Sequence, residues 1–314
     1  MAHKRSHDPC DGHDHSHNHG HAPKNFDRAF ALGIVLNVGF VAVEVVFGLL
    51  ANSLALLADA GHNLGDVLGL LLAWGASVLV RKLPTQRHTY GFRRTSVLAA
   101  LINALILLVA VGAISWEALL RFGHPESVAS GTVMFVASIG ILINGFTAWL
   151  FMSGKEDDMN IRGAYLHMAA DAAVSLGVVV AAIAMQFTGW LWLDPAVSLA
   201  IAMIIGIGTW SLLGESLNLA LDAVPASIQP DKVEAYLAGL PGVNAVHDLH
   251  IWAMSTTEIA LTVHLVKPDA VIDDALLLRI NNELREQFEI HHTTVQFELG
   301  DTSHPCKQAP AEAI

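Results

Sequence analysis

Residues 56–74 read LLADAGHNLGDVLGLLLAW, a segment apolar enough to cross a membrane that nevertheless carries three ionisable side chains. Asp59, His62 and Asp66 lie within two to three helical turns of one another. Each such residue at the centre of a bilayer costs roughly 2.5–3.5 kcal/mol on insertion scales. Because of this cost, ionisable residues inside a span usually mark an ion or proton pathway. We therefore expect these side chains to have a function within the membrane.

The whole chain is rich in apolar residues and poor in charged ones. Of its 314 residues, 53% are hydrophobic and only 15% are charged, whereas soluble domains carry about 25% charged residues. A helix needs roughly 20 apolar residues to cross a bilayer. We predict six transmembrane helices, over residues 28–50, 55–80, 95–120, 128–152, 161–187 and 191–214. The first 25 residues lack an apolar core, so no cleavable signal peptide is expected.

The links between the spans differ in their basic residues. The link between spans two and three (residues 81–94) holds five, and Lys155 and Arg162 lie between spans four and five. On the opposite side Arg121 stands alone. The positive-inside bias therefore predicts that both termini are cytoplasmic. Short links without a targeting segment favour a bacterial inner membrane, and no basic cluster indicates nucleic-acid binding.

From about residue 222 the pattern becomes that of a soluble domain. PDKVEAYLAGLPG predicts a short helix starting at Pro230, and AVHDLHIWAM and EIALTVHLV alternate as strands do. A second helix and a third strand follow. The second helix has one apolar stripe, made of Leu277, Ile280, Leu284 and Phe288. The order helix–strand–strand–helix–strand (αββαβ) predicts a small two-layer α+β domain.

These patterns divide the chain into four parts. We predict a His-rich disordered cytoplasmic tail over 1–25, a transport domain over 26–215, a metal-binding domain over 222–300 and a C-terminal tail over 301–314. The net charge of −12 belongs mostly to the soluble ends. Cys10 and Cys306 are both in predicted cytoplasmic tails, where a structural disulfide is not expected.

Two intramembrane pairs predict a metal site. His62 and Asp66 are four residues apart and share a helix face, and His167 and Asp171 repeat this spacing in span five. Two such helices facing each other would bring two imidazoles and two carboxylates together, a set that suits tetrahedral zinc. The two carboxylates would balance the charge of a 2+ ion. The alternative is that each pair forms only an interhelical hydrogen bond. The repeat of the same spacing in two spans favours the metal site over this alternative.

Three further polar residues in the spans leave their roles open. Asp59 is close to the same face as His62 and is either a partner of the ligands, a proton handler or a structural group. Asn37 and Glu44 of span one are candidates for hydrogen bonds between helices.

The first 21 residues contain seven of the 17 histidines together with Cys10. Such a His-rich tract of low hydrophobicity is typical of a disordered metal-binding arm. An expression tag is the alternative, but the irregular spacing and the interleaved acidic residues favour a native arm.

The chain resembles the cation diffusion facilitator family, in its zinc-type branch of proton-coupled metal exporters. The resemblance covers about residues 26–300 and is carried by six motifs. They are NVGFVAVEVVFG, SLALLADAGHNLGD, YGFRR, HMAAD, LDPAVS and VHDLHIW. It implies a homodimer, a metal between spans two and five, and a ferredoxin-like cytoplasmic domain.

The resemblance also implies zinc ligands in the cytoplasmic domain. The matching residues are His247, His264, His291 and Glu298. His250, His292 and His304 remain as alternatives, and the doubled His291–His292 leaves the choice open. A further site near span three in some relatives looks incomplete here, with only His88 as a ligand. Some members have a His-rich stretch between spans four and five, where this chain has the short link SGKEDDMN.

The expected function is export of zinc, with cadmium or cobalt as further cargo, in exchange for protons. An enzyme of the intramembrane metalloprotease class would need a motif such as His-Glu-x-x-His, which the sequence lacks. A membrane metal sensor without transport is the other alternative, although it would leave the buried ligands without a purpose. Transport measured in vesicles separates these classes.

Overall fold

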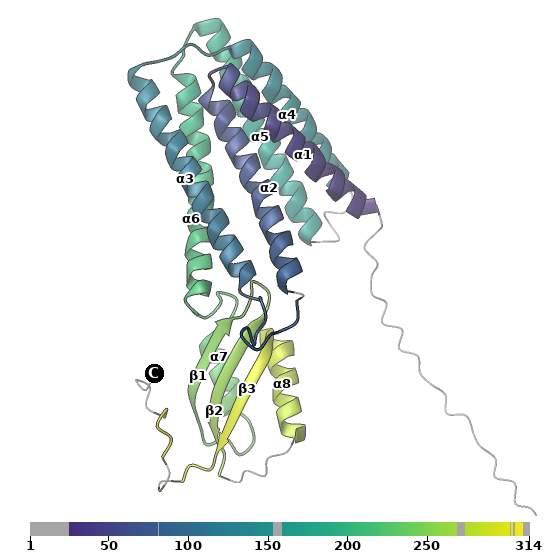
Figure 1. Cartoon of the computed structure of the whole chain (residues 1–314), viewed down its shortest axis with the longest axis vertical. Coiled ribbons are helices and arrows are strands. Elements are labelled where there is room, and N and C mark those ends of the chain that lie inside the picture. The colour runs from purple at the N-terminus through teal and green to yellow at the C-terminus, as the bar shows by residue number, and fades with distance from the viewer. Residues whose placement is uncertain are drawn as a thin grey trace, which may run out of the picture.

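A computed structural model describes residues 25–80, 82–152, 159–268, 274–301, 303 and 305–309. It has two parts, a bundle of long helices and a smaller α+β domain at one end of that bundle (Figure 1). The long helices are α1 (Asn25–Leu50), α2 (Leu54–Val80), α3 (Thr95–Gly123), α4 (Ser130–Phe151), α5 (Met159–Thr188) and α6 (Leu193–Ala220). They confirm the six predicted helices, and α6 continues past its predicted end at 214.

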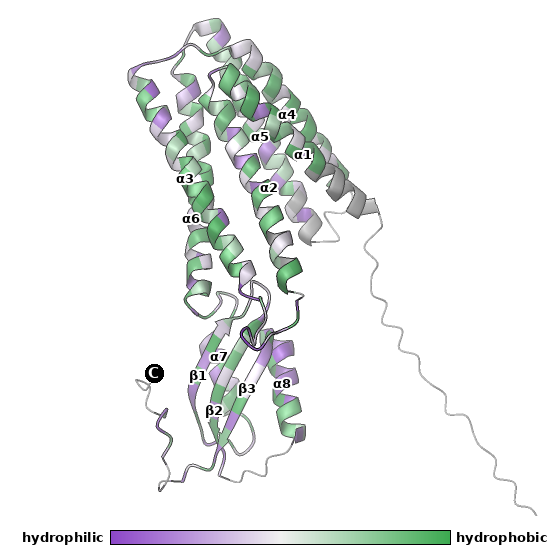
Figure 2. Cartoon of the chain, in the orientation of Figure 1, coloured by the Kyte–Doolittle hydropathy of each residue, from purple (hydrophilic) through white to green (hydrophobic). Residues whose placement is uncertain are grey.

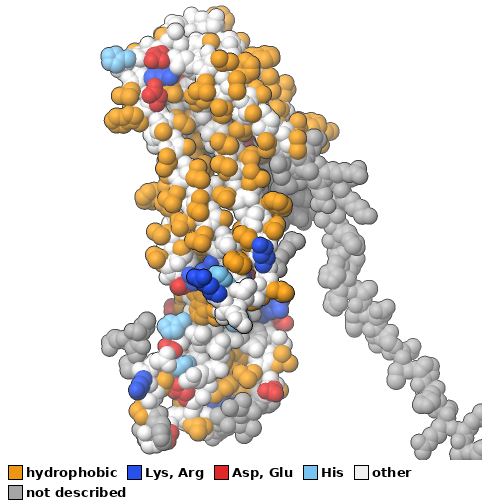
Figure 3. All heavy atoms as spheres, viewed as in Figure 1, with side chains coloured by type: hydrophobic (Ala, Val, Ile, Leu, Met, Phe, Trp, Pro, Cys, Tyr) orange, Lys and Arg blue, Asp and Glu red, His pale blue; other side chains and the backbone are white. Residues whose placement is uncertain are grey.

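The bundle has the surface of a membrane-embedded protein. Five of the long helices are long and apolar enough to span a membrane, and the described side chains of α1 add a shorter apolar stretch, Val35–Leu50. Figure 2 shows apolar residues along most of each helix. In Figure 3, hydrophobic side chains cover the visible face of the bundle, while charged side chains gather at its far end and around the soluble domain. An apolar surface of this extent is expected only where lipid replaces water.

The helices pack in two groups. Helix α4 packs along α5, and α3 packs along α6, whereas α2 contacts α1, α3 and α6. Gly65 allows the close approach of α2 to α3, because a Cβ at this position would collide with the side chain of Leu107. Small residues have this role in many membrane helix contacts. Helix α2 therefore connects the two groups, and it also carries half of the predicted metal ligands.

Asp194 at the start of α6 caps the N-terminus of α2. Its carboxylate accepts hydrogen bonds from the hydroxyl of Ser53 at 2.5 Å and from the backbone N–H groups of Leu54 at 2.7 Å and Ala55 at 3.4 Å. The first N–H groups of a helix have no partner within the helix. A carboxylate satisfies them and also complements the positive end of the helix dipole. This contact fixes the end of α2 farthest from the soluble domain.

The soluble domain has the predicted αββαβ order. Its elements are α7 (Pro230–Ala238), β1 (Ala245–Ala253), β2 (Ile259–Val266), α8 (Asp274–Phe288) and β3 (Ile290–Glu298). The sheet order is β1-β2-β3, with β1 antiparallel and β3 parallel to β2. The connection from β2 through α8 to β3 is the βαβ crossover that a parallel pair requires.

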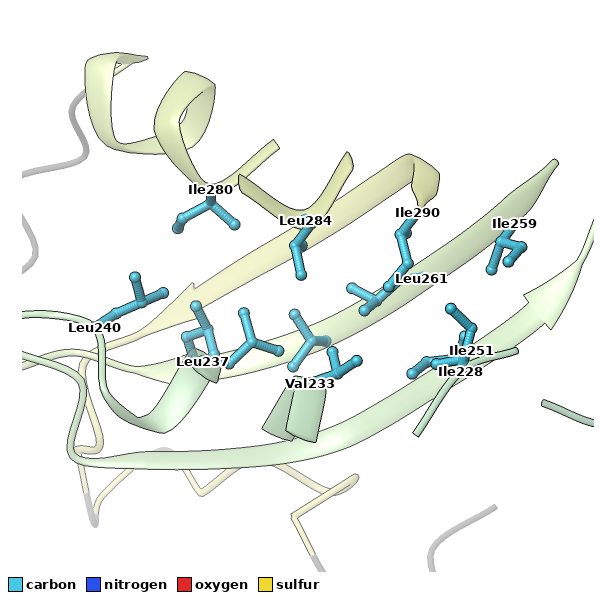
Figure 4. Close-up of a cluster of buried hydrophobic side chains, with 12 residues drawn as sticks. Ile228, Val233, Leu237, Leu240, Ile251, Ile259, Leu261, Ile280, Leu284 and Ile290 are labelled. Atoms are coloured by element: carbon cyan, nitrogen blue, oxygen red, sulfur yellow. The ribbon is translucent and has the colours of Figure 1, made fainter. Parts of the chain in front are cut away.

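The domain has its own hydrophobic core, between the sheet and the two helices (Figure 4). Alternate residues of β2 point into it, and Ile280 and Leu284 of α8 cover them. In this core Leu276, one turn before Ile280, takes the place that the predicted stripe gave to Leu277.

Several contacts join this domain to the membrane helices. Arg93 pairs with Glu258 and Arg94 pairs with Asp222, while the backbone N–H of Thr256 donates to Ser96 Oγ at 3.1 Å. The segment before α3 therefore contacts both the end of α6 and the β1–β2 turn.

Candidate metal sites

The four predicted intramembrane ligands converge between α2 and α5. His62 Nε2 lies 3.1 Å from Asp171 Oδ1 and 3.8 Å from Asp66 Oδ2. His167 Nε2 lies 3.2 Å from Asp66 Oδ2 and 3.6 Å from Asp171 Oδ2. We call these four residues the intramembrane quartet.

These separations fit a tetrahedral ion. Ligand atoms bound at roughly 2.0–2.2 Å from zinc lie about 3.3–3.6 Å from one another. Donor atoms of His62, Asp66 and Asp171 all lie within 4.8 Å of one another, and His167 is next to both carboxylates. Asp66 Oδ2 and Asp171 Oδ2 are buried and accept no hydrogen bond. Buried carboxylate oxygens with free lone pairs are suited to a cation.

The quartet is closed on the side away from the soluble domain. One turn beyond it, Ser175 donates a hydrogen bond at 2.9 Å to the fully buried Asp59. Farther along lies a layer of packed apolar side chains. This layer includes Ala51, Ala55, Ala58, Val133, Val178, Val179, Ala182 and Met185. An ion at the quartet could not pass this layer without a rearrangement of the helices.

The quartet is more open on the other side. Asp171 is only 1% exposed, whereas the side chains of His62, Asp66 and His167 are 25%, 36% and 41% exposed. Helices α2 and α5 contact each other little, compared with the long contact of α4 with α5. The more exposed part of each helix is the part nearer the soluble domain. The site thus opens toward that domain.

A second polar layer surrounds the quartet. The fully buried Glu44 of α1 accepts a hydrogen bond at 3.0 Å from Asn63, the residue after His62. This bond joins α1 to α2, as expected of an interhelical contact. Asn37 donates to the sulfur of Met168, next to His167, at 3.7 Å. Glu44 and Asn37 therefore each contact a residue next to a member of the quartet.

A second cluster lies at one end of the sheet, where β1, β2 and β3 meet. Glu298 Oε2 is 3.3 Å from His247 Nε2, and Glu298 Oε1 is 3.0 Å from His264 Nδ1. Cys306, from the segment after β3, lies with its sulfur 3.6 Å from His264 Nδ1. The donor atoms of these four residues all lie within 4.8 Å of one another. We call His247, His264, Glu298 and Cys306 the domain cluster.

A bulge in β1 helps to build the domain cluster. The pairing of β1 with β2 shifts between His247 and His250, and Asp248 has a positive φ of 52°. Bulges redirect side chains in this way. Asp248 Oδ2 lies 3.4 Å from His264 Nε2. A carboxylate at the second nitrogen of an imidazole is the usual way in which proteins orient a metal-binding histidine.

The other candidate histidines lie elsewhere. His291 is exposed at the opposite end of β3 from Glu298, so the structure does not bring it into the domain cluster. His292 packs edge-on against Tyr90, and His250 lies 3.0 Å from Asp248. His88 stacks on Phe92. His304 and the His-rich arm over 1–21 lie outside the described residues.

Sequence reasoning missed Cys306 and Asp248. Nothing in the local pattern around Cys306 indicates a ligand, because two of its neighbours in space, His247 and His264, come from strands some 40 to 60 residues earlier. Asp248 lies between two histidines in VHDLH, and regular alternation places it on the opposite face from His247. The bulge removes that alternation, and a bulge cannot be read from this sequence.

The other residues of the domain cluster affect the charge of Glu298. Burial raises the pKa of its carboxyl. Hydrogen bonds from Cys306 and Gln296, together with the nearby imidazoles, lower the pKa by more, so that it lies below its usual value. Glu298 is therefore a carboxylate at neutral pH, the form that binds a metal ion.

The fold and the two clusters describe a membrane protein with a polar cation site between its helices and a soluble domain that carries further metal-ligand chemistry. The cation efflux transmembrane domain model matches residues 30–219, and the cytoplasmic domain model of cation efflux proteins matches residues 225–299. The chain belongs to the cation diffusion facilitator (cation efflux) family, in its zinc-type branch. This is a family of transporters, and the chain is accordingly a multi-pass membrane protein with a cytoplasmic domain.

Curated relatives match nearly the whole chain. The metal cation efflux system protein CzcD of Cupriavidus metallidurans is 37% identical over 298 residues, covering 95% of this chain and 92% of the relative. The zinc transporter ZitB of Escherichia coli is 37% identical over 297 residues, covering 94% and 93%. A cadmium, cobalt and zinc/H(+)-K(+) antiporter of Bacillus subtilis is 34% identical over 295 residues, covering 92% and 93%.

Solved structures also match parts of the chain. The metal-bound C-terminal domain of the CzcD transporter from Cupriavidus metallidurans is 40% identical, with a TM-score of 0.22, and covers 23% of this chain and all of that one.

Proposed function

We propose that the protein exports zinc from the cytoplasm in exchange for protons, and that the intramembrane quartet holds the ion during transport. The convergence of two imidazoles and two carboxylates at 3.1–3.8 Å, between helices in the membrane, carries this proposal. Four ligands of these types suit tetrahedral zinc. The two carboxylates neutralise the ion, which lowers the cost of holding it away from water.

The direction of opening fits export. The quartet is reached from the side of the cytoplasmic domain and is closed on the opposite side by the apolar layer around Ala58 and Val178. A cytoplasmic ion can enter this state and cannot leave outward. Export then requires a second state in which the apolar layer opens and the cytoplasmic side closes, which is alternating access.

Protons compete for the same ligands. An imidazole ordinarily has a pKa near 6.5, so it exchanges a proton for a metal ion within the physiological range. An acidic outer compartment would favour release of zinc and loading of protons, and the return to the cytoplasm would release the protons. The relative in Bacillus subtilis whose name includes H(+) antiport agrees with this coupling.

The cargo is zinc first, with cadmium and cobalt as further ions. Imidazole suits zinc and other late transition metals, whereas carboxylate and water suit magnesium and manganese. The names of the relatives include zinc, cadmium and cobalt. A mixed nitrogen and oxygen site accommodates all three.

The proposal also covers topology, oligomeric state and the roles of the parts outside the membrane. Both termini are cytoplasmic, the membrane is the bacterial inner membrane, and the protein works as a homodimer. The domain cluster binds a resident zinc ion, which reports cytoplasmic metal and tightens the dimer. The arm over 1–21 gathers metal near the entrance.

A metal sensor without transport is the second candidate, and the domain cluster favours it because that cluster alone could bind metal in the cytoplasm. It does not account for a second ligand set inside the membrane. A sensor would bind zinc but would move none across a bilayer.

The test is zinc uptake into inverted membrane vesicles, whose outer face is the cytoplasmic one. Uptake should accelerate when the lumen is made acidic and fall back when a protonophore collapses the gradient. Vesicles with Asp171→Asn provide the matched control and should show only leakage. Uptake that ignores an imposed pH gradient would refute proton coupling, and absence of uptake in a folded protein would favour the sensor.

A further inference from the structure

The strands supply only three of the donors in the domain cluster. His247 comes from β1, His264 from β2 and Glu298 from the end of β3. Their separations of 3.0 and 3.3 Å are at or slightly below the edge length of a tetrahedron around one zinc ion. His264 is buried, and His247 Nε2 is buried without a hydrogen-bond partner. Three ligands leave one position of a structural zinc site unfilled, because such sites take four protein ligands.

The C-terminal segment returns to this position. After β3 the chain turns at Gly300, whose φ of +70° and close contact with Val266 exclude a side chain. Asp301 then accepts two hydrogen bonds from Ser303, at 2.6 Å from its hydroxyl and 2.9 Å from its backbone N–H. Beyond this turn Cys306 comes back against the sheet and helps to line a cleft with His247 and Glu298.

The sulfur of Cys306 occupies the fourth corner. It lies 3.6 Å from His264 Nδ1, the same nitrogen that faces Glu298, while Asp248 faces the other nitrogen of this ring. Zinc–sulfur bonds of about 2.3 Å make the edges that include sulfur slightly longer than the others, as found here. The orientation of His264 thus directs one nitrogen to the centre of the cluster and leaves the other to a carboxylate.

We propose that Cys306 is the fourth ligand of a resident metal site in the domain cluster, so that a bound thiophilic divalent cation fastens the C-terminal segment to the sheet. The inference rests on the proposed metal binding by this domain and adds its fourth ligand. On binding, the thiol gives up its proton and forms a metal–sulfur bond. Thiolate and Glu298 carboxylate together balance the charge of the ion.

The two metal sites then differ in chemistry. The quartet offers nitrogen and oxygen atoms, whereas the domain cluster adds a soft sulfur, which favours cadmium and zinc over harder ions. A site that holds its ion tightly suits a resident ion, and a site without sulfur suits an ion that must leave.

The test uses cobalt(II) as the probe, because a cobalt–thiolate bond gives a charge-transfer absorption in the near ultraviolet that nitrogen and oxygen ligands do not give. The full chain with Cys10→Ser has Cys306 as its single thiol. It should show this band on addition of cobalt, and zinc should abolish it. The matched control, with Cys10→Ser and Cys306→Ser together, should lack the band.

A second variant tests whether the sulfur belongs to the cluster. In the Cys10→Ser background, Glu298→Gln or His264→Gln should weaken the band, although Cys306 remains. Zinc should also slow alkylation of Cys306 by a maleimide, because the thiolate that would react is then bound to the metal. A band that is absent with Cys306 present, or one that survives both cluster variants, would overturn the proposal.

These outcomes are independent of transport. If the band is absent while Asp171→Asn abolishes zinc uptake, Cys306 is not a ligand and the proposed function stands. If the band is present while wild-type vesicles take up no zinc, the resident site stands and the transport proposal fails.

Discussion

At the scale of single residues, two features set the chemistry of the quartet. The i, i+4 spacing brings His62 with Asp66, and His167 with Asp171, onto one face of each helix. The antiparallel arrangement of α2 and α5 then pairs each imidazole with the carboxylate of the other helix, at 3.1 and 3.2 Å. Each carboxylate is thus shared between two imidazoles, and a single ion can replace all four of these contacts.

Replacing Asp66 or Asp171 by Ala should abolish zinc export. Each variant removes a ligand and one of the two charges that balance the ion. Folding should remain near normal, because an uncompensated buried carboxylate is itself unfavourable. The measurement is zinc efflux from loaded cells, with expression checked in the membrane fraction. Asp231→Asn, on the exposed start of α7, is the control and should export normally. Wild-type efflux from either quartet variant would refute the assignment.

His62→Asp should narrow the preference for zinc over manganese. The variant site would have three carboxylates and one imidazole, which is harder and more negative. Cadmium, a softer ion, should be handled less well. Asp is shorter than His, so zinc transport should also slow. Competitive uptake of zinc and manganese into vesicles measures the ratio, and an unchanged ratio at a normal rate would show that His62 is not a ligand.

At the scale of elements, periodicity and spacing predicted those features of the fold that depend on one segment of the chain. Six apolar runs predicted the membrane helices, and three predicted strands with two further helices predicted the αββαβ order. The quartet was also predictable, because its spacing within α2 is repeated in α5. The bulge at Asp248, the return of Cys306 and the displacement of His291 depend on pairing between strands, which no single segment encodes.

The Asp194 cap on α2 is the contact between elements whose removal should lower stability most clearly. Asp194→Ala would leave the hydroxyl of Ser53 and two backbone N–H groups without their acceptor in a buried place. A hydrogen bond to a charged group contributes about 1.5–3 kcal/mol, so the midpoint of thermal unfolding in detergent should fall clearly.

The effect of Asp194→Ala should be confined to stability. Zinc binding by the folded fraction should persist, since Asp194 lies at the end of α2 and not at the quartet. Glu126→Gln, in the exposed loop before α4, keeps an acceptor for Asn52 at the same end of the bundle and should lower the midpoint far less. An unaltered midpoint for Asp194→Ala would show that the cap does not stabilise α2.

At the scale of the whole molecule, the two parts are linked through the turn between β1 and β2, at the opposite end of the sheet from the domain cluster. Arg93 pairs with Glu258 in the turn between β1 and β2, and these strands carry His247 and His264. The same segment begins α3, which packs against α2. A change in the cytoplasmic domain can therefore reach the helix that carries His62 through contacts that the structure shows.

Deletion of residues 1–21 should leave export intact at saturating zinc and weaken it when zinc is scarce. An arm with seven histidines raises the local ion concentration but forms no part of the proposed membrane path. The measurement is the initial rate of vesicle uptake over a range of zinc concentrations, with a chain in which the seven histidines are replaced by Ser as the matched control. Loss of all transport in a well-expressed truncation would contradict this role.

The most direct test of the quartet is X-ray absorption at the zinc edge. The sample is the protein without residues 1–21 and with His264→Ala. In this variant the quartet is the one proposed metal site that is left intact. We predict one zinc per chain with four nitrogen and oxygen ligands at about 2.0–2.2 Å, two of them imidazoles, and no sulfur. Asp171→Asn in the same background should lose this zinc. Zinc that remains bound with the same ligands after Asp171→Asn, or a ligand shell without imidazole, would contradict the central claim.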